Sequence, residues 1–268
     1  MAKHKLAVLG CGNMGSAIAL GLAKKSKNFE IIAYNPTPKK AQKIANETKG
    51  KRAASMDDVK HGEYFLIACK PQQFGDLAKE LLPQLSKKSV IVSIMAGVSV
   101  AKMKKLLPKA ELFVRVMPNT PCLIGEGVSG IYFTSNISKE KKNVVKEIFS
   151  AVSKVFFFKN ETEIDTVTAA TGAGPAYIFE FAIQMIQKTI AMGIDPKTAE
   201  AMIQQLFVGA SLLMANSPDS PETLRNKVTS KGGTTEAALK KLKEYQIDKA
   251  ISEALEAAFQ RAKELSQL

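Results

Sequence analysis

Residues 5–15, with the sequence KLAVLGCGNMG, decide the fold of this chain. A short apolar run ends at Gly10, the helix pattern of residues 13–25 follows, and a second apolar run covers residues 29–34. A strand, a G-x-G-x-x-G loop, a helix and a second strand within about 30 residues are typical of a dinucleotide-binding unit. We therefore predict that the chain begins with such a unit.

Each loop glycine has a physical task. Gly10 permits a tight turn, Gly12 lets the backbone approach a pyrophosphate, and Gly15 lets the helix pack closely against the strand. Asn13 and Met14 stand at the start of the helix, where unpaired N–H groups attract phosphate. We expect all five residues to contact the cofactor.

The position about 20 residues after the last glycine distinguishes NAD from NADP. Asn35 at this position is neutral, whereas a carboxylate would bind the ribose 2′-hydroxyl and repel a 2′-phosphate. Thr37, Lys39 and Lys40 follow at the start of a predicted helix, and this combination of hydroxyl, helix N-terminus and ammonium groups suits a phosphate. We therefore expect NADP as the cofactor, with NADPH preferred and NADH also usable.

Strand and helix patterns alternate up to Phe158. Strands are predicted at residues 63–69, 90–95, 112–117, 128–134 and 155–158, and helices at residues 72–85, 98–107 and 138–153. Such alternation gives a doubly wound sheet with a mainly parallel core. The predicted fold class is therefore α/β, with a Rossmann-like NADP-binding domain over residues 1–160.

Three turns after predicted strands are expected to line a cofactor cleft with the glycine loop, because ligands of doubly wound sheets bind at the carboxyl ends of the strands. Lys70, in the first turn, either approaches the cofactor phosphates or points to solvent. The cofactor-binding residues expected in these turns are Cys69, Lys70, Pro71, Met95, Ala96, Gly97 and Asn119.

After Phe158 the patterns are helical. Helices are predicted at residues 164–171, 174–192, 196–216, 221–229, 235–245 and 247–265. Residues 169–186 and 201–213 are apolar nearly all round, which indicates faces buried against a second subunit. We therefore predict an all-α dimerisation domain over residues 161–268.

Composition restricts the class of protein. The net charge is +13, but the lysines are scattered and aromatics are few, which favours solvated helix faces and a small anionic ligand over nucleic acid. Three widely spaced cysteines indicate a reducing compartment, so we expect the cytoplasm. Glu180 and Lys188 within residues 176–192 predict a buried core helix and no membrane partner. No Cys or His spacing suggests a metal site.

Residues 228–239, VTSKGGTTEAAL, place hydroxyl groups and two glycines before an amphipathic helix. Gly232 and Gly233 allow a turn that presents N–H groups outward, and the helix N-terminus adds further donors. The loop is either a site for a small anion such as a carboxylate, or an ordinary helix start capped by Thr234 or Thr235.

Together these motifs resemble the pyrroline-5-carboxylate reductase family over essentially the whole chain. The resemblance is carried by residues 10–15, 70–72, 95–97, 117–121, 171–177 (TGAGPAY) and 224–235. It implies NADPH-dependent reduction of 1-pyrroline-5-carboxylate to L-proline, the final step of proline biosynthesis, in a homodimer or a decamer. It also implies that the nicotinamide lies near residues 95–97 and Asn119.

The resemblance implies roles for the second loop as well. The substrate-binding residues would be Ser230, Gly232, Gly233, Thr234 and Thr235, with the Thr235 hydroxyl as the catalytic group on the ring nitrogen. A protonated imine already carries its proton, so the reaction requires no strong acid.

Two positions depart from the family pattern. Lys231 stands where the family usually has proline, and it adds a cation beside the expected carboxylate site. Pro36 stands where many members have arginine, which leaves the 2′-phosphate to Thr37, Lys39 and Lys40.

Two alternatives remain open at this point. A β-hydroxyacid dehydrogenase would carry a catalytic lysine four residues after a glycine of the second domain, but that count from Gly174 reaches Ile178. A nucleotide-binding regulatory protein without turnover would have no need of the Ser230–Thr235 loop. Finally, Cys11, Cys69 and Cys122 fall in turns at the cofactor edge, where they are either inert or sites of inhibitory modification from which NADPH protects.

Overall fold

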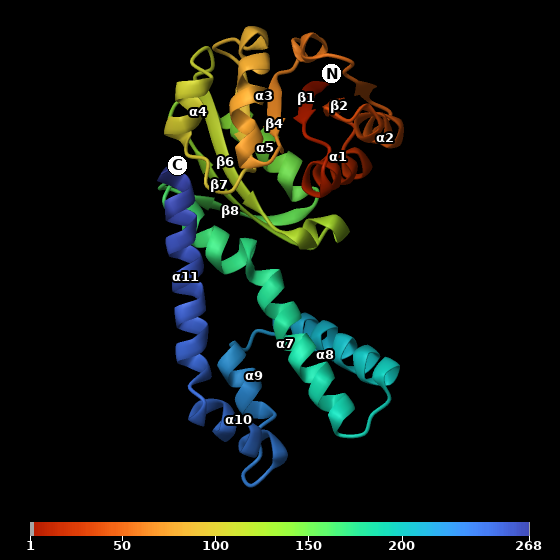
Figure 1. The fold of residues 1–268 in the computed structure, drawn as a ribbon, viewed down its shortest axis with the longest axis vertical. Coiled ribbons are helices and arrows are strands. Elements are labelled where there is room, and N and C mark those ends of the chain that lie inside the picture. The colour runs from red at the N-terminus through yellow and green to blue at the C-terminus, as the bar shows by residue number, and fades with distance from the viewer. Residues whose placement is uncertain (1–2, 268) are drawn as a thin grey trace. The chain divides into compact units, whose positions relative to one another are not determined.

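The computed structural model describes residues 3–267 and contains one eight-stranded sheet in the order β3-β2-β1-β4-β5-β6-β7-β8 (Figure 1). The strands are β1 (His4–Leu9), β2 (Phe29–Tyr34), β3 (Lys51–Arg52), β4 (Tyr64–Ile67), β5 (Val90–Ser93), β6 (Leu112–Pro118), β7 (Gly127–Phe133) and β8 (Ser153–Phe158). All neighbouring pairs are parallel except β6 and β7. The predicted doubly wound sheet is confirmed, with one reversal of direction at β7.

Helices cover both faces of the sheet. One apolar core joins the sheet to α1 (Asn13–Lys25), α2 (Pro38–Thr48) and α5 (Lys139–Ser150), and the other joins it to α3 (Phe74–Leu81) and α4 (Val100–Leu106). Within β1, Leu6 and Val8 belong to the first core, whereas Ala7 and Leu9 belong to the second. Successive strand residues point to opposite faces, so a strand covered on both sides is a continuous apolar run in the sequence.

One local prediction was wrong in detail, and one short strand was missed. The helix expected over residues 72–85 is a 3₁₀ turn at Pro71–Gln73, then α3, then a second 3₁₀ turn at Leu82–Gln84. Pro83 has no N–H and crowds the preceding turn, which is why α3 ends at Leu81. The two-residue strand β3 was not predicted, because two residues carry no periodicity.

The second half of the chain is helical, as predicted. Its elements are α6 (Glu163–Val167), a π-helical turn (Thr168–Gly172), α7 (Gly174–Ala191), α8 (Pro196–Asn216), α9 (Pro221–Lys227), α10 (Thr234–Glu244) and α11 (Ile247–Gln267). Asp195, Ser220 and Gly233 are the N-cap residues of α8, α9 and α10, and only the first two provide a side-chain acceptor.

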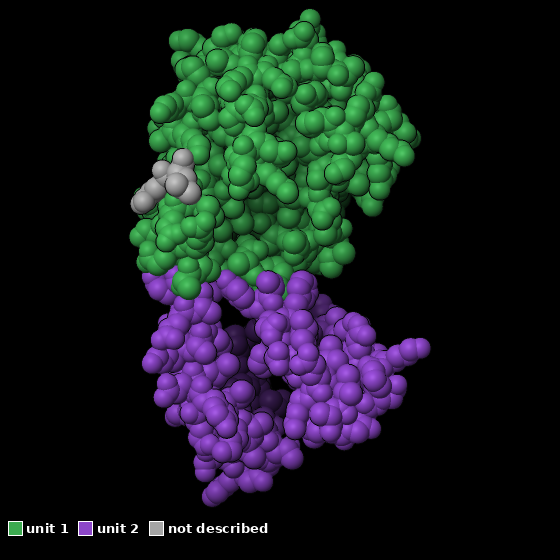
Figure 2. All heavy atoms as spheres, viewed as in Figure 1, with its two compact units in different colours: residues 1–175, 257–268 green, residues 176–256 purple. Residues whose placement is uncertain are grey.

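The chain divides by compactness into two units, residues 1–175 with 257–268, and residues 176–256 (Figure 2). The domains expected from the sequence, 1–160 and 161–268, follow the change from alternating strands and helices to helices alone. In the division into compact units, residues 161–175 and the end of α11 belong instead to the unit that contains the sheet.

The helices of residues 176–256 have few buried side chains. Within this range, all of which the structure describes, only Ala199 and Ile203 are buried. The expectation that residues 176–192 form a buried core helix is therefore wrong for the single chain, since α7 has no buried residue. Within residues 3–267, no helix is long and apolar enough to cross a membrane.

Arg115, in the middle of β6, is only 3% exposed and lies in a buried ionic cluster. Its guanidinium donates to Glu161 Oε1 and to Asp165 Oδ1, both at 3.0 Å. Glu161 Oε1 also accepts the Val100 N–H at 2.7 Å, and Ser266 Oγ donates to Asp165 Oδ1 at 3.0 Å. One cation therefore connects β6 to the start of α4, to α6 and to the end of α11.

Replacing Arg115 by methionine should destabilise the protein by about 3–5 kcal/mol, because the buried Asp165 and the partly buried Glu161 lose their cation. Urea denaturation measures this loss. Adding Glu161→Gln and Asp165→Asn to the same variant should recover much of it, since the uncharged side chains still accept the Val100 and Ser266 hydrogen bonds. Methionine at the exposed Arg52 is the control and should change the stability by less than about 0.5 kcal/mol. Equal losses at both positions would contradict the role given to Arg115.

Candidate active site

The glycine loop connects β1 to α1. Gly10 has φ of +113°, and a Cβ there would lie 2.6 Å from the Ala68 carbonyl oxygen. A Cβ on Gly15 would overlap the carbonyl oxygen of Gly10. By contrast, nothing lies within 4 Å of a Cβ built on Gly12. The packing of the chain itself thus requires Gly10 and Gly15, whereas Gly12 leaves space that a ligand can fill.

Asn35, at the end of β2, holds this loop in place. Its Oδ1 accepts the Cys11 N–H at 3.0 Å, and its Nδ2 donates to the Thr37 carbonyl oxygen at 3.3 Å. Gly12 is the N-cap of α1 and offers no side-chain acceptor to the N–H groups of the first turn. The helix N-terminus therefore keeps the donors and the partial positive charge that bind phosphate.

A cavity of about 490 Å³ lies beside the loop. Six of the cofactor residues expected from the sequence line it: Gly10, Gly12, Asn35, Thr37, Cys69 and Lys70. Lys40 also lines it, whereas Lys39 does not. The lysine that lines the cavity beside the neutral Asn35 and the N-terminus of α2 is therefore Lys40. Its neighbour Lys39 is outside this lining.

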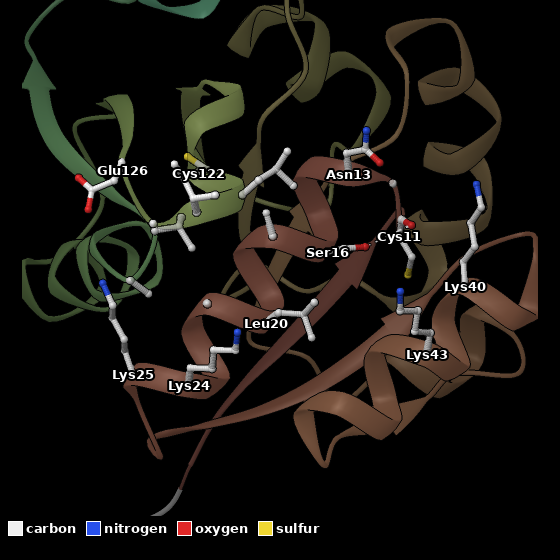
Figure 3. A pocket seen from close by; sticks show the side chains of 18 residues that line it. Cys11, Asn13, Ser16, Leu20, Lys24, Lys25, Lys40, Lys43, Cys122 and Glu126 are labelled. Atoms are coloured by element: carbon white, nitrogen blue, oxygen red, sulfur yellow. Dashed lines mark hydrogen bonds between the residues drawn. The ribbon is translucent and has the colours of Figure 1, made fainter. Parts of the chain in front are cut away.

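A second cavity, of about 610 Å³, runs along α1, and its lining includes Asn13, which the sequence predicts to bind the cofactor (Figure 3). Gly12 and Lys40 line both cavities. Figure 3 shows Lys40 on α2 near the Cys11 loop, and Lys24 on α1. The four lysines of this lining are Lys24, Lys25, Lys40 and Lys43. This excess of positive charge beside an uncapped helix start favours an anionic ligand.

The other predicted cofactor residues line neither cavity. Met14 packs against the apolar core, Gly15 contacts the loop backbone, and Pro71 begins a 3₁₀ turn. Met95 is buried, with Sδ 3.6 Å from the Cys69 Sγ. Ala96 is partly exposed.

Gly97 has a steric reason to be glycine. Its φ is +67°, and a Cβ there would lie too close to the side chain of Leu265 on α11. Backbone conformation and helix packing both exclude a side chain at this position.

The side-chain amide of Asn119 forms its hydrogen bonds with backbone groups of the protein. Its Nδ2 donates to the Thr171 carbonyl oxygen at 3.1 Å, and its Oδ1 accepts the Val128 N–H at 2.8 Å. The side chain thereby joins the end of β6 to β7 and to the π-helical turn. Such π-turns often occur at functional sites. Here the turn also brings Gly172 against the terminal methyl group of Met117, which would have to move to admit a side chain at residue 172.

The second predicted loop, Ser230–Thr235, precedes α10. Gly232 has φ of +74°, and its N–H donates to Glu236 Oε2 at 2.7 Å. The Gly233 N–H donates to the Ser230 carbonyl oxygen at 3.0 Å. Two of the N–H groups offered for anion binding are therefore already used within the loop.

The capping expected of Thr234 or Thr235 is wrong. Gly233 is the N-cap of α10, and no side chain caps this helix. Glu236, at the third helical position, reaches back to the loop instead, as the acidic residue of a capping box does. Among the residues that the structure describes, none accepts the N–H of Thr234 or Thr235. These two donors, with both hydroxyls beside them, remain available to an anion.

Comparison with known proteins covers both halves. Residues 161–265 match a family model described as pyrroline-5-carboxylate reductase dimerisation, and residues 5–97 match one described as NADP oxidoreductase, coenzyme F420-dependent. The chain is 35% identical to the pyrroline-5-carboxylate reductase of Pasteurella multocida, over 100% of both proteins. It is 36% identical to that of Haemophilus influenzae, over 99% of both.

The chain belongs to the pyrroline-5-carboxylate reductase family.

Solved structures agree with this membership. A pyrroline-5-carboxylate reductase of Coxiella burnetii superimposes with a TM-score of 0.92 at 31% identity, over 99% of both chains. The Plasmodium falciparum pyrroline carboxylate reductase, solved with NADP bound, gives 0.86 at 28% identity, also over 99% of both chains. Prephenate dehydrogenase of Aquifex aeolicus, at 18% identity and a TM-score of 0.55, shares only the fold. The family favours the reductase over both alternatives considered from the sequence.

Two residues of this reductase fold were missed by the sequence analysis. Arg115 had a usable signal, because a single charge inside the apolar run of residues 112–117 requires a buried partner. Glu236 also had one, since an acidic residue three positions after an N-cap commonly reaches back to the preceding backbone.

Burial makes the three free thiols poor nucleophiles. It raises the pKa of Cys11 and of Cys69 to about 11 and raises that of Cys122, so each is protonated at neutral pH. We expect iodoacetamide to label all three slowly at neutral pH, and the labelling rates of Cys11 and Cys69 should rise with hydroxide until the pH reaches about 11. Mass spectrometry of the labelled protein measures this. Fast labelling at neutral pH that NADPH suppresses would instead support the inhibitory modification.

The two glycines of the loop should respond differently to alanine. Gly12→Ala should leave the stability unchanged, because nothing surrounds its Cβ, and should weaken binding of NADPH by about tenfold, or 1.4 kcal/mol. Gly15→Ala should cost about 1–3 kcal/mol of stability, since the methyl group overlaps the backbone. Thermal unfolding and NADPH titration separate the two effects. Unchanged NADPH affinity of Gly12→Ala would exclude the pyrophosphate from this position.

Proposed function

We propose that the chain reduces 1-pyrroline-5-carboxylate to L-proline with NADPH, the final step of proline biosynthesis. The observation that carries this proposal is the identity of 35% to a curated reductase over the full length of both proteins. The loop geometry supports it, because the phosphate-binding features and the carboxylate-binding features are both present.

The residues around the 490 Å³ cavity fit a dinucleotide phosphate. Gly12 leaves space beside the uncapped start of α1, where backbone N–H groups can hold a pyrophosphate. Asn35, Thr37 and Lys40 line the cavity at the expected position of the 2′-phosphate, and the two carboxylates of the same lining, Asp76 and Glu80, belong to α3. Bound NADPH supplies the hydride for the imine carbon. Met95, Ala96, Gly97 and Asn119 are proposed near the nicotinamide, although Asn119 would act there mainly by fixing the π-helical turn.

The substrate carboxylate is proposed to bind the loop before α10. The free N–H groups of Thr234 and Thr235 suit it, with the Ser230 hydroxyl as a further donor and Lys231 as a nearby cation. Gly232 and Gly233 shape the turn, because their own N–H groups are already used.

Thr235 is the proposed catalytic residue. Its Oγ1 would accept the N–H of the protonated imine, which orients the ring and keeps the proton on nitrogen while the carbon gains hydride. The nitrogen becomes the secondary amine of proline, so no separate acid is needed. Positioning of the two reactants then provides most of the rate enhancement.

The assembly is proposed to be a homodimer through residues 161–265, the range that matches the dimerisation family model. Helices α7 and α8 support this, because Phe179 is 60% exposed, Leu212 58% and Leu213 59% in the single chain. A decamer built from such dimers remains a prediction. The three free cysteines fit the cytoplasm, where thiols stay reduced.

An assay of NADPH oxidation with 1-pyrroline-5-carboxylate tests the function directly. We expect turnover with L-proline as the product, and a higher kcat/KM with NADPH than with NADH because of Lys40 and the neutral Asn35. A preparation that binds NADPH but does not oxidise it with this substrate would refute the proposal. Equal or better efficiency with NADH would refute the cofactor preference alone.

Thr235→Ala should lower kcat/KM by a factor of about 2–13, corresponding to one neutral hydrogen bond of about 0.5–1.5 kcal/mol. The side chain does not cap α10, so circular dichroism and thermal unfolding should stay unchanged. Thr235→Ser should restore most of the activity. Thr234→Ala is the matched control from the same helix start. Equal kinetics of the two alanine variants would remove the catalytic role from Thr235.

Leu212→Glu combined with Leu213→Glu should disrupt the dimer, because two charges would enter an apolar interface. Sedimentation velocity at equal concentrations should show a smaller species than the unchanged protein. Glutamate at Lys197 and at Lys240, both exposed, is the control. Unchanged sedimentation of the leucine variant would exclude this face from the interface.

A further inference from the structure

A basic and aromatic surface lies at the end of the sheet opposite to the glycine loop. β7 runs antiparallel to β6, which pairs Phe133 with Val114, and β8 runs parallel to β7. The ends of β7 and β8 therefore lie beside the beginning of β6, while the cofactor cavity lies at the carboxyl ends of β1, β2 and β4. A ligand at this surface would not be the cofactor of the reductase.

The surface contains a cavity of about 560 Å³, a volume within the range of roughly 300–1,000 Å³ typical of small-molecule sites. Four lysines and two stacked phenylalanines are prominent in its lining: Lys139, Lys142, Lys146, Lys159, Phe133 and Phe157. Among the described residues that line it, none is acidic. We call these six residues the lysine–phenylalanine surface.

The two rings form a platform with one open side. The centroids of Phe133 and Phe157 are 5.9 Å apart at an interplanar angle of 26°, so the rings are stacked. Phe157 is 51% exposed on the edge strand β8. Lys142 Nζ lies 5.6 Å from the centroid of Phe133. A further flat ring could stack on the Phe157 side while an ammonium group stays close by.

The charge of this surface is not neutralised within the protein. Lys139, Lys142 and Lys146 are three and four residues apart on α5, which places them on one face of the helix. Of the four ammonium groups, none lies within 4.0 Å of a carboxylate in the described part of the chain. Glu147 of the same helix instead accepts hydrogen bonds from Ser26 and Asn28. Like charges this close repel, and a bound anion would relieve the repulsion.

We propose that the lysine–phenylalanine surface binds a nucleoside phosphate, with its base stacked on Phe157 and its phosphates between the lysines of α5. Stacking requires an aromatic ring, the lysines require an anion, and a nucleotide supplies both to the single cavity that these side chains line. This site is independent of the reductase reaction and would make the chain responsive to a second nucleotide.

The chain contains no tryptophan, which allows a reporter at the platform itself. In Phe157→Trp, the full-length protein would carry its sole tryptophan at the proposed stacking position, so ADP bound in the cofactor cleft would not quench it directly. Phe156→Trp is the matched control, because Phe156 is 43% exposed on the same strand but points to the other face of the sheet. The probes are ADP, adenosine, pyrophosphate and a single-stranded thymidine oligonucleotide.

We expect ADP to quench Phe157→Trp saturably, pyrophosphate to compete without quenching, adenosine to bind much more weakly, and Phe156→Trp to respond to none of them. Changing Lys139, Lys142 and Lys146 together to glutamine should weaken ADP binding by about tenfold or more, since charge-assisted contacts are lost. Circular dichroism checks that this variant is folded, and its NADPH-dependent activity should be unchanged.

Two outcomes would overturn the proposal. Quenching by the oligonucleotide but not by ADP would make this a surface for single-stranded nucleic acid. No quenching by any probe would show that this surface binds no nucleotide. The lysines would then serve to keep the exposed edge strand from pairing with other chains.

Discussion

One buried positive charge holds the central parts of this structure together. Burying a guanidinium away from water costs about several kcal/mol of desolvation free energy. Only well-placed carboxylates and further hydrogen bonds offset that cost. Arg115 finds two carboxylates, each of which also receives a donor from another element. Since hydrogen bonds to a charged group tolerate little displacement, the start of α6, the start of α4 and the end of α11 are fixed relative to β6.

The parts of the fold that depend on local pattern were predictable from the sequence. The glycine loop, the alternation along the sheet and the six helices of the second half follow from turn chemistry and apolar periodicity, which act over a few residues. Arg115 could be suspected but not paired, because its partners lie 46 and 50 residues further along the chain. The reversal at β7 also escaped, since antiparallel and parallel neighbours have the same apolar pattern here.

The candidate site likewise has features that the local sequence predicts and features that depend on packing. Gly10, Gly12, Asn35 and Thr37 could be placed at one cavity from the sequence, because their positions follow from backbone geometry at strand ends. Which of two adjacent lysines borders the cavity depends on the rotation of α2, and that is set by the packing of Ala41, Ile44 and Ala45. The use of the Gly232 N–H by Glu236 is a choice between a ligand and a side chain, and the sequence allows either.

The helices of residues 176–256 bury only Ala199 and Ile203 in the single chain, so in the proposed homodimer the partner would contribute much of their stability. In an assembly of identical chains this has a genetic consequence. A cell that makes two alleles would form mixed assemblies, and a copy with a damaged α7 or α8 would weaken its intact partner. Harmful substitutions on these exposed helices would therefore behave as dominant, whereas those in the sheet would remain recessive.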